Sequence, residues 1–302
     1  MAIGPESTPS WIGDAVELGG AAVVEPAEAN VLLWSAPDDP AGLRAILTEA
    51  GDHIVWVQLP WAGIEPYVDI VDDVRIWTCG KGVYAEPVAE MALTLSLAGL
   101  RGLGRYARSD SWRQHGFQGV NLRGARVAVL GGGGITEAFV RLLGPFGTHT
   151  TVVRRNPSPL AGAQRVVGFE ATDEAITEAD LVVLALALTD ETRGVIDRRR
   201  LELLHPESWI VNVARGQHIV TDDLVDALTK GAIGGAGLDV TDPEPLPDDH
   251  PLWTLDNCII TPHVGNTPDM ARPLLAERIA NNLARWAEGA ALLGRVDPEL
   301  GY

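Results

Sequence analysis

Four consecutive glycines directly after a short apolar run are the feature that most constrains the fold of this chain. Residues 127–136 have the sequence VAVLGGGGIT, and apolar residues with helical spacing follow up to position 143. This pattern predicts a strand, a tight turn and a helix. Glycine has no Cβ and tolerates positive φ, so a diphosphate can approach the backbone and lie against the helix N-terminus. The stretch therefore predicts a dinucleotide site.

The match to the G-x-G-x-x-G pattern is incomplete. Gly131 and Gly133 fill the first two glycine positions, but Thr136 stands at the third, where glycine permits close packing of helix on strand. We expect Thr136 either to push the helix outward or to use its hydroxyl locally. Glycine-rich turns also occur for purely structural reasons, so the turn by itself leaves both interpretations open.

The end of the next predicted strand indicates which dinucleotide would bind. Residues 148–153 predict a strand, and Arg154 and Arg155 follow it. Folds that select NAD usually place an acidic residue here for the ribose 2′-hydroxyl, whereas arginine suits a 2′-phosphate. The pair favours NADP(H), with NAD(H) as the alternative. Two solvated arginines without a ligand are the plain structural interpretation.

Length, charge and cysteine content exclude several classes of protein. A chain of 302 residues is long enough for two domains, and its net charge of −18 argues against nucleic acid or an anionic membrane as partner. The N-terminus does not resemble a signal peptide, and no apolar run approaches about 18 residues, so we expect a cytoplasmic protein. Cys79 and Cys258 lie far apart without a Cys/His cluster, so we expect no metal site.

Short apolar runs alternate with helical segments along most of the chain. Residues 11–92 predict a small parallel α/β unit, and residues 86–100 predict a helix that bridges two domains. Residues 58–64, QLPWAGI, form either an anion-binding turn or an ordinary loop. Further apolar runs predict strands buried on both faces of a parallel sheet; they lie at 126–130, 149–153, 165–167, 181–186, 209–213, 236–240 and 258–260.

Polar side chains follow three of these predicted strands. Arg215 lies two residues beyond the run 209–213, Asp239 lies near the end of the run 236–240, and His263 follows the run 258–260. Glu244 lies in the proline-rich loop after Asp239. Ligands of such sheets bind beyond the carboxyl ends of the strands, so these side chains are expected to converge. Each alone has a plain explanation as an ion pair, a loop carboxylate or a turn residue; together, beside a dinucleotide turn, they predict an active site.

These motifs together resemble the D-isomer-specific 2-hydroxyacid dehydrogenase family, and within it the glyoxylate/hydroxypyruvate reductases. Besides VAVLGGGGIT, the matching pieces are LTDETRGVID (188–197), VNVARGQHIVTDDLVDAL (211–228), GAIGGAGLDVTDPEPLPDDHPLW (231–253) and NCIITPHVGNT (257–267). They stand in family order and cover most of residues 88–270. The N-terminal part matches weakly, through QLPWAGIE (58–65) and KGVYAEPVAEMAL (81–93).

The resemblance implies a two-domain α/β fold. A Rossmann-like doubly wound parallel sheet would occupy residues 93–270, and a smaller flavodoxin-like α/β substrate domain would comprise residues 1–92 and 271–302, including a helix at 276–293. Because the chain would cross twice, a hinge would close the cleft and exclude water. The family also implies a homodimer, for which residues 101–123 are the candidate interface arm; the cluster Arg101, Arg105, Arg108 and Arg113 in this segment either faces solvent or pairs across an oligomer interface.

The resemblance also implies a role for each candidate catalytic residue. His263 would be the general acid that protonates a ketone oxygen, Glu244 would hydrogen-bond the imidazole and fix its tautomer, and Arg215 would bind the substrate carboxylate. Backbone amides near Ala62, Gly63 and Val83 would hold the same carboxylate. The partner is thus a small 2-oxo or 2-hydroxy acid.

The cofactor would contact the glycine turn, the two arginines and the loops after the later strands. By resemblance these residues are Gly131, Gly132, Gly133, Gly134, Ile135, Arg154, Arg155, Leu186, Ala187, Thr192, Val213, Ala214, Asp239, His263 and Gly265. Two positions depart from the family pattern: Thr136 replaces the third glycine, and Ala187 stands where the family often has proline.

Two other functions fit the same residues. One is an NAD-linked dehydrogenase of a bulkier D-2-hydroxy acid, with an aromatic pocket from Trp61, Tyr84, Trp253 and Trp286. The other is a non-catalytic dinucleotide-sensing protein with this fold. A phosphorylated substrate would need a further cation, for which Arg272 is the candidate.

Overall fold

The computed structural model describes residues 1–112 and 119–298, which divide into two compact units. The first comprises residues 1–84 with the C-terminal segment from Thr267 onward, and the second comprises Ala85–Asn266. The division falls at the start of helix α3 (Ala85–Leu100) and just before helix α9 (Pro268–Ala287). The predicted boundary at residue 92 falls inside α3.

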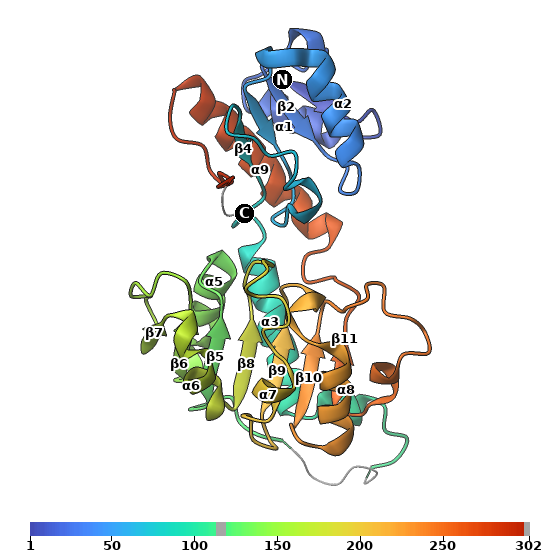
Figure 1. Cartoon of the computed structure of the whole chain (residues 1–302), viewed down its shortest axis with the longest axis vertical. Helices are drawn as coiled ribbons and strands as arrows, with labels where there is room; N and C mark the ends of the chain where they lie inside the picture. Colours follow the sequence, from blue (N-terminus) through green and yellow to red (C-terminus); the bar gives the residue numbers. More distant parts are fainter. Residues whose placement is uncertain (113–118, 299–302) are drawn as a thin grey trace. The chain divides into compact units, whose positions relative to one another are not determined.

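The larger unit is built on a seven-stranded parallel sheet. In chain order its strands are β5 (Arg126–Leu130), β6 (His149–Val153), β7 (Arg165–Val167), β8 (Leu181–Leu184), β9 (Trp209–Asn212), β10 (Gly235–Leu238) and β11 (Cys258–Ile260). Figure 1 shows them side by side in the order β7-β6-β5-β8-β9-β10-β11. The order reverses between β5 and β8, which is where a doubly wound sheet opens a crevice for a ligand. The predicted Rossmann-like sheet is confirmed.

Helices cover both faces of this sheet. Successive side chains along a strand point to opposite faces, and each face has its own hydrophobic core. Val127 and Val129 pack with α3 and with α5 (Gly134–Leu143), whereas Ala128 and Leu130 belong to a second core on the other face. The remaining helices of this unit are α4 (Leu103–Ala107), α6 (Thr172–Thr177), α7 (Arg198–Leu201) and α8 (Thr221–Lys230).

Three predicted strands end earlier than their apolar runs. The runs 181–186, 209–213 and 236–240 become strands that end at Leu184, Asn212 and Leu238. Beyond these ends Val213 and Val240 are still buried and Ala185 and Leu186 are partly buried, but the backbone turns away to form the loops at the carboxyl edge. Asp239 therefore lies directly after β10 and not within a strand.

The smaller unit has a four-stranded parallel sheet whose strands lie in chain order, without a reversal. They are β1 (Ala2–Gly4), β2 (Val31–Trp34), β3 (Trp56–Gln58) and β4 (Ile76–Thr78). Strand β1 was missed at the sequence level because three residues are too short to show alternation; only its pairing with residues 32–34 of β2 defines it. The helices of this unit are α1 (Trp11–Leu18), α2 (Pro40–Ala50) and α9.

Helix α9 begins eight residues before the predicted start at 276 and ends at Ala287. Thr267 caps it by accepting a hydrogen bond from the amide of Met270, and Pro268 occupies its first turn. Leu275, Ile279 and Leu283 pack with the buried side chains of α1, which makes α9 part of this unit's core.

The described part of the chain also contains short 3₁₀ turns, at Pro26–Glu28, Gly51–His53, Glu65–Tyr67, Gly144–Phe146, Phe169–Ala171, Gly216–His218 and Pro251–Thr254. Within residues 1–112 and 119–298, every helix is too short or too polar to span a bilayer.

Candidate active site

The glycine turn lies at the switch point of the larger sheet. Gly131 follows β5 with φ of 121°, and a Cβ atom there would lie 2.1 Å from the carbonyl oxygen of Ala185, which follows β8. Only glycine fits both the backbone conformation and this approach. The loops after β5 and β8 therefore meet at the crevice where dinucleotides bind in such sheets.

The two arginines after β6 have different surroundings. The stem of Arg154 lies over Gly132, where a Cβ atom would be 2.3 Å from its Cδ, and its Nε is buried without a hydrogen-bond partner among the described residues. Arg155 is exposed, and its Nη2 lies 3.4 Å from a carboxylate oxygen of Glu191. The Nη atoms of Arg154 donate to Gly132 and Ser158, and its buried Nε, which lacks a partner among the described residues, is the guanidinium nitrogen that fits an anionic dinucleotide beside the glycine turn.

Helix α5 offers its N-terminus to the same place. Its N-cap is Gly133, which makes no side-chain cap and has open space where a Cβ would lie. Gly134 and Ile135 begin the helix. Amides at an uncapped helix N-terminus donate to an anion such as a diphosphate.

Thr136 is fully buried, and its hydroxyl has no hydrogen-bond partner among the described residues. Of the two alternatives stated for Thr136, the local use of its hydroxyl is therefore not what the described residues show. A buried hydroxyl without a partner loses its hydration and gains nothing in return.

Substitution Thr136→Val is expected to raise the free energy of unfolding by about 1 kcal/mol, because valine keeps the shape and removes the unpaired hydroxyl. Urea denaturation measures it. Thr150→Val is the matched control: Thr150 is also buried, but its hydroxyl bonds that of Thr148 at 2.9 Å, so this change should destabilise the protein. Equal losses in both variants would contradict the interpretation.

Arg215 lies in a tightly ordered turn after β9. Asn212, fully buried, accepts from the amide of Ala214 at 3.0 Å and donates to the carbonyl of Arg215 at 2.8 Å. A Cβ atom on Gly216 would lie 1.9 Å from the carbonyl oxygen of Thr241. The turn after β9 thus packs directly against the turn after β10. Sequence reasoning missed the need for Gly216, whose only signal is its position directly after the arginine.

His263 and Glu244 form an ion pair or hydrogen bond at the carboxyl edge. Nδ1 of His263 lies 2.7 Å from Oε1 of Glu244, and both side chains are about half exposed. A carboxylate at Nδ1 favours the tautomer with a proton there, which leaves Nε2 free to exchange a proton with a ligand. The sequence-predicted pair is therefore brought together in the structure.

Asp239 holds the loop on which His263 stands. His263 has φ of 53°, an uncommon conformation for a residue with a side chain, and its amide donates to the Asp239 carbonyl at 2.8 Å. The buried Asp239 carboxylate accepts from the Thr261 hydroxyl and from the amides of Val264 and Gly265, at 2.6, 3.0 and 2.9 Å. Asp239 thus fixes the strained turn that presents the imidazole.

The other predicted cofactor residues lie in the loops after β8 and β9. Leu186, Ala187 and Thr192 belong to the first, where the Thr192 hydroxyl donates to the Ala187 carbonyl at 2.7 Å. Val213 and Ala214 directly follow β9 and are buried. The larger unit therefore gathers its predicted site residues on loops at one edge of its sheet. Within the described ranges, no cluster of three or more Cys, His, Asp or Glu residues suits a metal ion.

Ala62, Gly63 and Val83 lie in the smaller unit, in the loops after β3 and β4. A Cβ atom on Gly80 would be 2.3 Å from the Pro60 carbonyl oxygen, so the two loops touch. The amide of Val83 donates to the Gly80 carbonyl at 2.9 Å within its own turn. Because that bond occupies the Val83 amide, Ala62 and Gly63 are the stronger candidates for an anion.

Tyr84 ties these loops together. Its hydroxyl donates to the Pro60 carbonyl at 2.7 Å, and burial raises the pKa of Tyr84 to about 12. The phenol therefore keeps its proton, and with it this hydrogen bond, across the neutral range.

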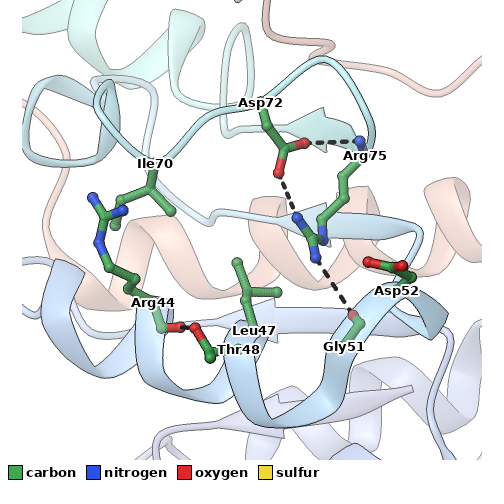
Figure 2. A pocket seen from close by; sticks show the side chains of 8 residues that line it. All are labelled: Arg44, Leu47, Thr48, Gly51, Asp52, Ile70, Asp72 and Arg75. Carbon is green, nitrogen blue, oxygen red and sulfur yellow. Dashed lines mark hydrogen bonds and ion pairs between the residues drawn. The ribbon is translucent and has the colours of Figure 1, made fainter.

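A cavity of about 320 Å³ also lies in the smaller unit, lined by Arg44, Leu47, Thr48, Gly51, Asp52, Ile70, Asp72 and Arg75. Figure 2 shows Asp72 bonded to Arg75, which also reaches the Gly51 carbonyl. These residues precede β3 and β4, whereas ligands of parallel sheets bind at the carboxyl ends. The position and the internal charge pairing argue against this cavity as the active site.

Comparisons with known proteins agree with this geometry. A family model described as "D-isomer specific 2-hydroxyacid dehydrogenase, NAD binding domain" matches residues 91–265. A "Glyoxylate reductase/hydroxypyruvate reductase" from Homo sapiens is 35% identical over 257 residues, which cover 82% of this chain and 78% of the relative. An uncharacterized protein from Corynebacterium melassecola is 37% identical over 89% of this chain and 88% of its own length.

Among solved structures, a D-isomer specific 2-hydroxyacid dehydrogenase from Xanthobacter autotrophicus Py2, in complex with NADPH and MES, superposes with a TM-score of 0.86. It is 28% identical, and the alignment covers 100% of this chain and 98% of that one.

Proposed function

The chain belongs to the D-isomer-specific 2-hydroxyacid dehydrogenase family, and from this premise we propose that it reduces glyoxylate or hydroxypyruvate with NADPH as the favoured cofactor. It is an NAD(P)-linked oxidoreductase that acts on small 2-oxo acids. The observation that supports this proposal most strongly is the 2.7 Å contact between His263 and Glu244, on the same sheet edge as Arg215.

The proposed roles follow from the contacts. When bound, the nicotinamide supplies the hydride. Nε2 of His263 delivers the proton to the substrate oxygen, while Glu244 holds the imidazole in place through Nδ1. The guanidinium of Arg215 binds the substrate carboxylate.

The first test is the initial rate of NADPH and NADH oxidation with glyoxylate, hydroxypyruvate, pyruvate and phenylpyruvate. We expect the rates with glyoxylate and hydroxypyruvate to be highest, and to be higher with NADPH than with NADH. A preference for phenylpyruvate and NADH would favour the bulkier-acid alternative. Measurable cofactor binding without turnover of any acid would favour the sensing protein.

The structure weakens the aromatic-pocket interpretation. Trp286 packs on Trp56 with ring centroids 5.5 Å apart, and Trp61 stacks on Tyr67 at 5.9 Å, so both rings have partners within the smaller unit. Arg272, the candidate for a substrate phosphate, lies 5.8 Å over the ring of Trp11. These contacts favour a small, unphosphorylated acid.

Double substitution of Arg154 and Arg155 by alanine is expected to raise the Kd of NADPH about 100-fold and leave that of NADH within about threefold, because two charge-assisted bonds to the 2′-phosphate are lost. Fluorescence titration measures both constants. Arg126→Ala, an exposed arginine at the opposite end of β5 paired with Glu178, is the control. Equal weakening of both cofactors would refute the role of the two arginines.

We also propose a cytoplasmic homodimer. Leu103, Tyr106 and Trp112 are exposed near α4, and Trp112 is 95% exposed, which suits an interface in the predicted arm. Arg113 of that arm lies outside the described residues. A cytoplasmic location suits an enzyme that depends on the cellular supply of NADPH. Light scattering of the purified protein tests the dimer.

A further inference from the structure

His218 is a fully buried histidine that contacts two of the loops at the candidate site. Its Nδ1 lies 3.2 Å from the backbone amide nitrogen of Arg215 and 3.0 Å from the carbonyl oxygen of the same residue, and its Nε2 lies 3.3 Å from the carbonyl oxygen of Ala187. Arg215 follows β9, whereas Ala187 follows β8. One imidazole thus joins the loop of the proposed substrate arginine to a loop of the proposed cofactor site.

The tautomer with its proton on Nε2 satisfies the contacts to the Arg215 amide and to the Ala187 carbonyl, whereas a proton on Nδ1 would donate to the Arg215 carbonyl instead. With its proton on Nε2, the ring donates to the Ala187 carbonyl and leaves Nδ1 as acceptor for the Arg215 amide. A buried imidazole whose two nitrogens are both hydrogen-bonded is held in one orientation. Its bonds in turn fix the positions of the backbone groups that it contacts.

The backbone around His218 is held independently of its side chain. The amide of Gly194 donates to Gln217, that of Ile196 donates to the carbonyl of His218, and that of Val220 donates to Ile196, at 2.8, 2.9 and 2.9 Å. This short parallel pairing keeps the segment in place without the imidazole. The backbone pairing of this segment therefore does not depend on the His218 side chain.

We propose that His218 is a positioning residue with two separate duties: Nδ1 sets the backbone of Arg215 for carboxylate binding, and Nε2 holds the Ala187 loop for the dinucleotide. The proposal rests on the proposed function for the identity of the two ligands. It assigns His218 no contact with substrate, cofactor or reacting atoms.

Two partial mimics separate the duties. The amide oxygen of asparagine reaches as far as Nδ1, so His218→Asn keeps the bond to Arg215 and loses that to Ala187. Glutamine reaches as far as Nε2, so His218→Gln does the reverse. The loss of one buried hydrogen bond corresponds to about tenfold in an equilibrium constant.

We therefore expect His218→Asn to raise the Kd of NADPH about tenfold and leave the KM of glyoxylate within about twofold. We expect His218→Gln to raise the KM of glyoxylate about tenfold and leave the Kd of NADPH within about twofold. Fluorescence titration gives the Kd, initial rates give the KM, and thermal unfolding checks the fold. His205→Asn and His205→Gln are matched controls, because His205 precedes β9 and so lies at the other edge of the sheet.

The proposal is overturned if neither variant changes either constant, or if both constants change together in both variants in proportion to the fall in Tm. Should the unaltered protein reduce no 2-oxo acid, the proposed function fails separately. The Kd of oxalate, measured by calorimetry as a carboxylate probe, then replaces the KM, and the same crossed pattern is required.

Discussion

Substitution His263→Asn is expected to lower kcat by about 10³-fold, the contribution typical of a general acid, with the Kd of NADPH nearly unchanged. Asparagine tolerates the positive φ at this position, so the loop held by Asp239 should survive. What the variant lacks is a group that exchanges a proton at the place of Nε2. Single-turnover and steady-state rates measure the loss, and cofactor titration measures what remains.

His250→Asn is the matched control for this experiment. His250 lies in the same unit, and its Nδ1 accepts from the amide of Leu252 at 3.3 Å as a cap for the turn Pro251–Thr254. We expect its kcat to stay within about twofold of the unaltered protein. If His263→Asn retained most of its turnover, the acid/base role of His263 would have to be abandoned.

Substitution Arg215→Leu is expected to lower kcat/KM for glyoxylate by about 10³-fold, because a charge-assisted bidentate bond to the carboxylate disappears and the carbonyl loses a polarising cation. In contrast to the His263 variant, much of the loss should appear in KM. The kcat and KM values for several 2-oxo acids measure this loss, together with the Kd of oxalate.

Arg215→Lys distinguishes charge from geometry. Lysine keeps the positive charge but has no planar fork, so we expect an intermediate loss of about 10- to 100-fold. Arg198→Leu is the control for a lost arginine, since Arg198 is exposed and bonded to Asp223 and Asp226. A KM unchanged by Arg215→Leu would mean that the carboxylate binds elsewhere.

The bond between His263 and Glu244 could be anticipated because both residues follow neighbouring strands of one parallel sheet. The same rule anticipated Arg215 on this edge. Local periodicity did not indicate that the Asp239 carboxylate would accept hydrogen bonds from the amides after His263. Those bonds depend on how two loops fold over each other. Its ordering role was visible only in three dimensions.

Close approaches between loops were hidden from the sequence for a related reason. Gly216 and Gly131 are required by carbonyl oxygens of Thr241 and Ala185, which are remote in the chain or separated by other strands. The stem of Arg154 over Gly132 is another such contact. A glycine in the sequence is consistent with a position that tolerates no side chain, but the sequence does not identify the atom that would clash with a Cβ there.

The parallel α/β class, the strand-turn-helix at the glycines and the position of Arg215, Glu244 and His263 beyond strand ends could all be predicted from the amino-acid sequence. These features follow from hydrophobic periodicity and from the geometry of parallel sheets, which act over short stretches or follow simple topological rules. Three features came to light only in the assembled fold: β1 is a strand, the Thr136 hydroxyl has no partner among the described residues, and His218 joins two loops. Each of these depends on partners far along the chain, and such partners become neighbours only when the sheet and its loops are assembled.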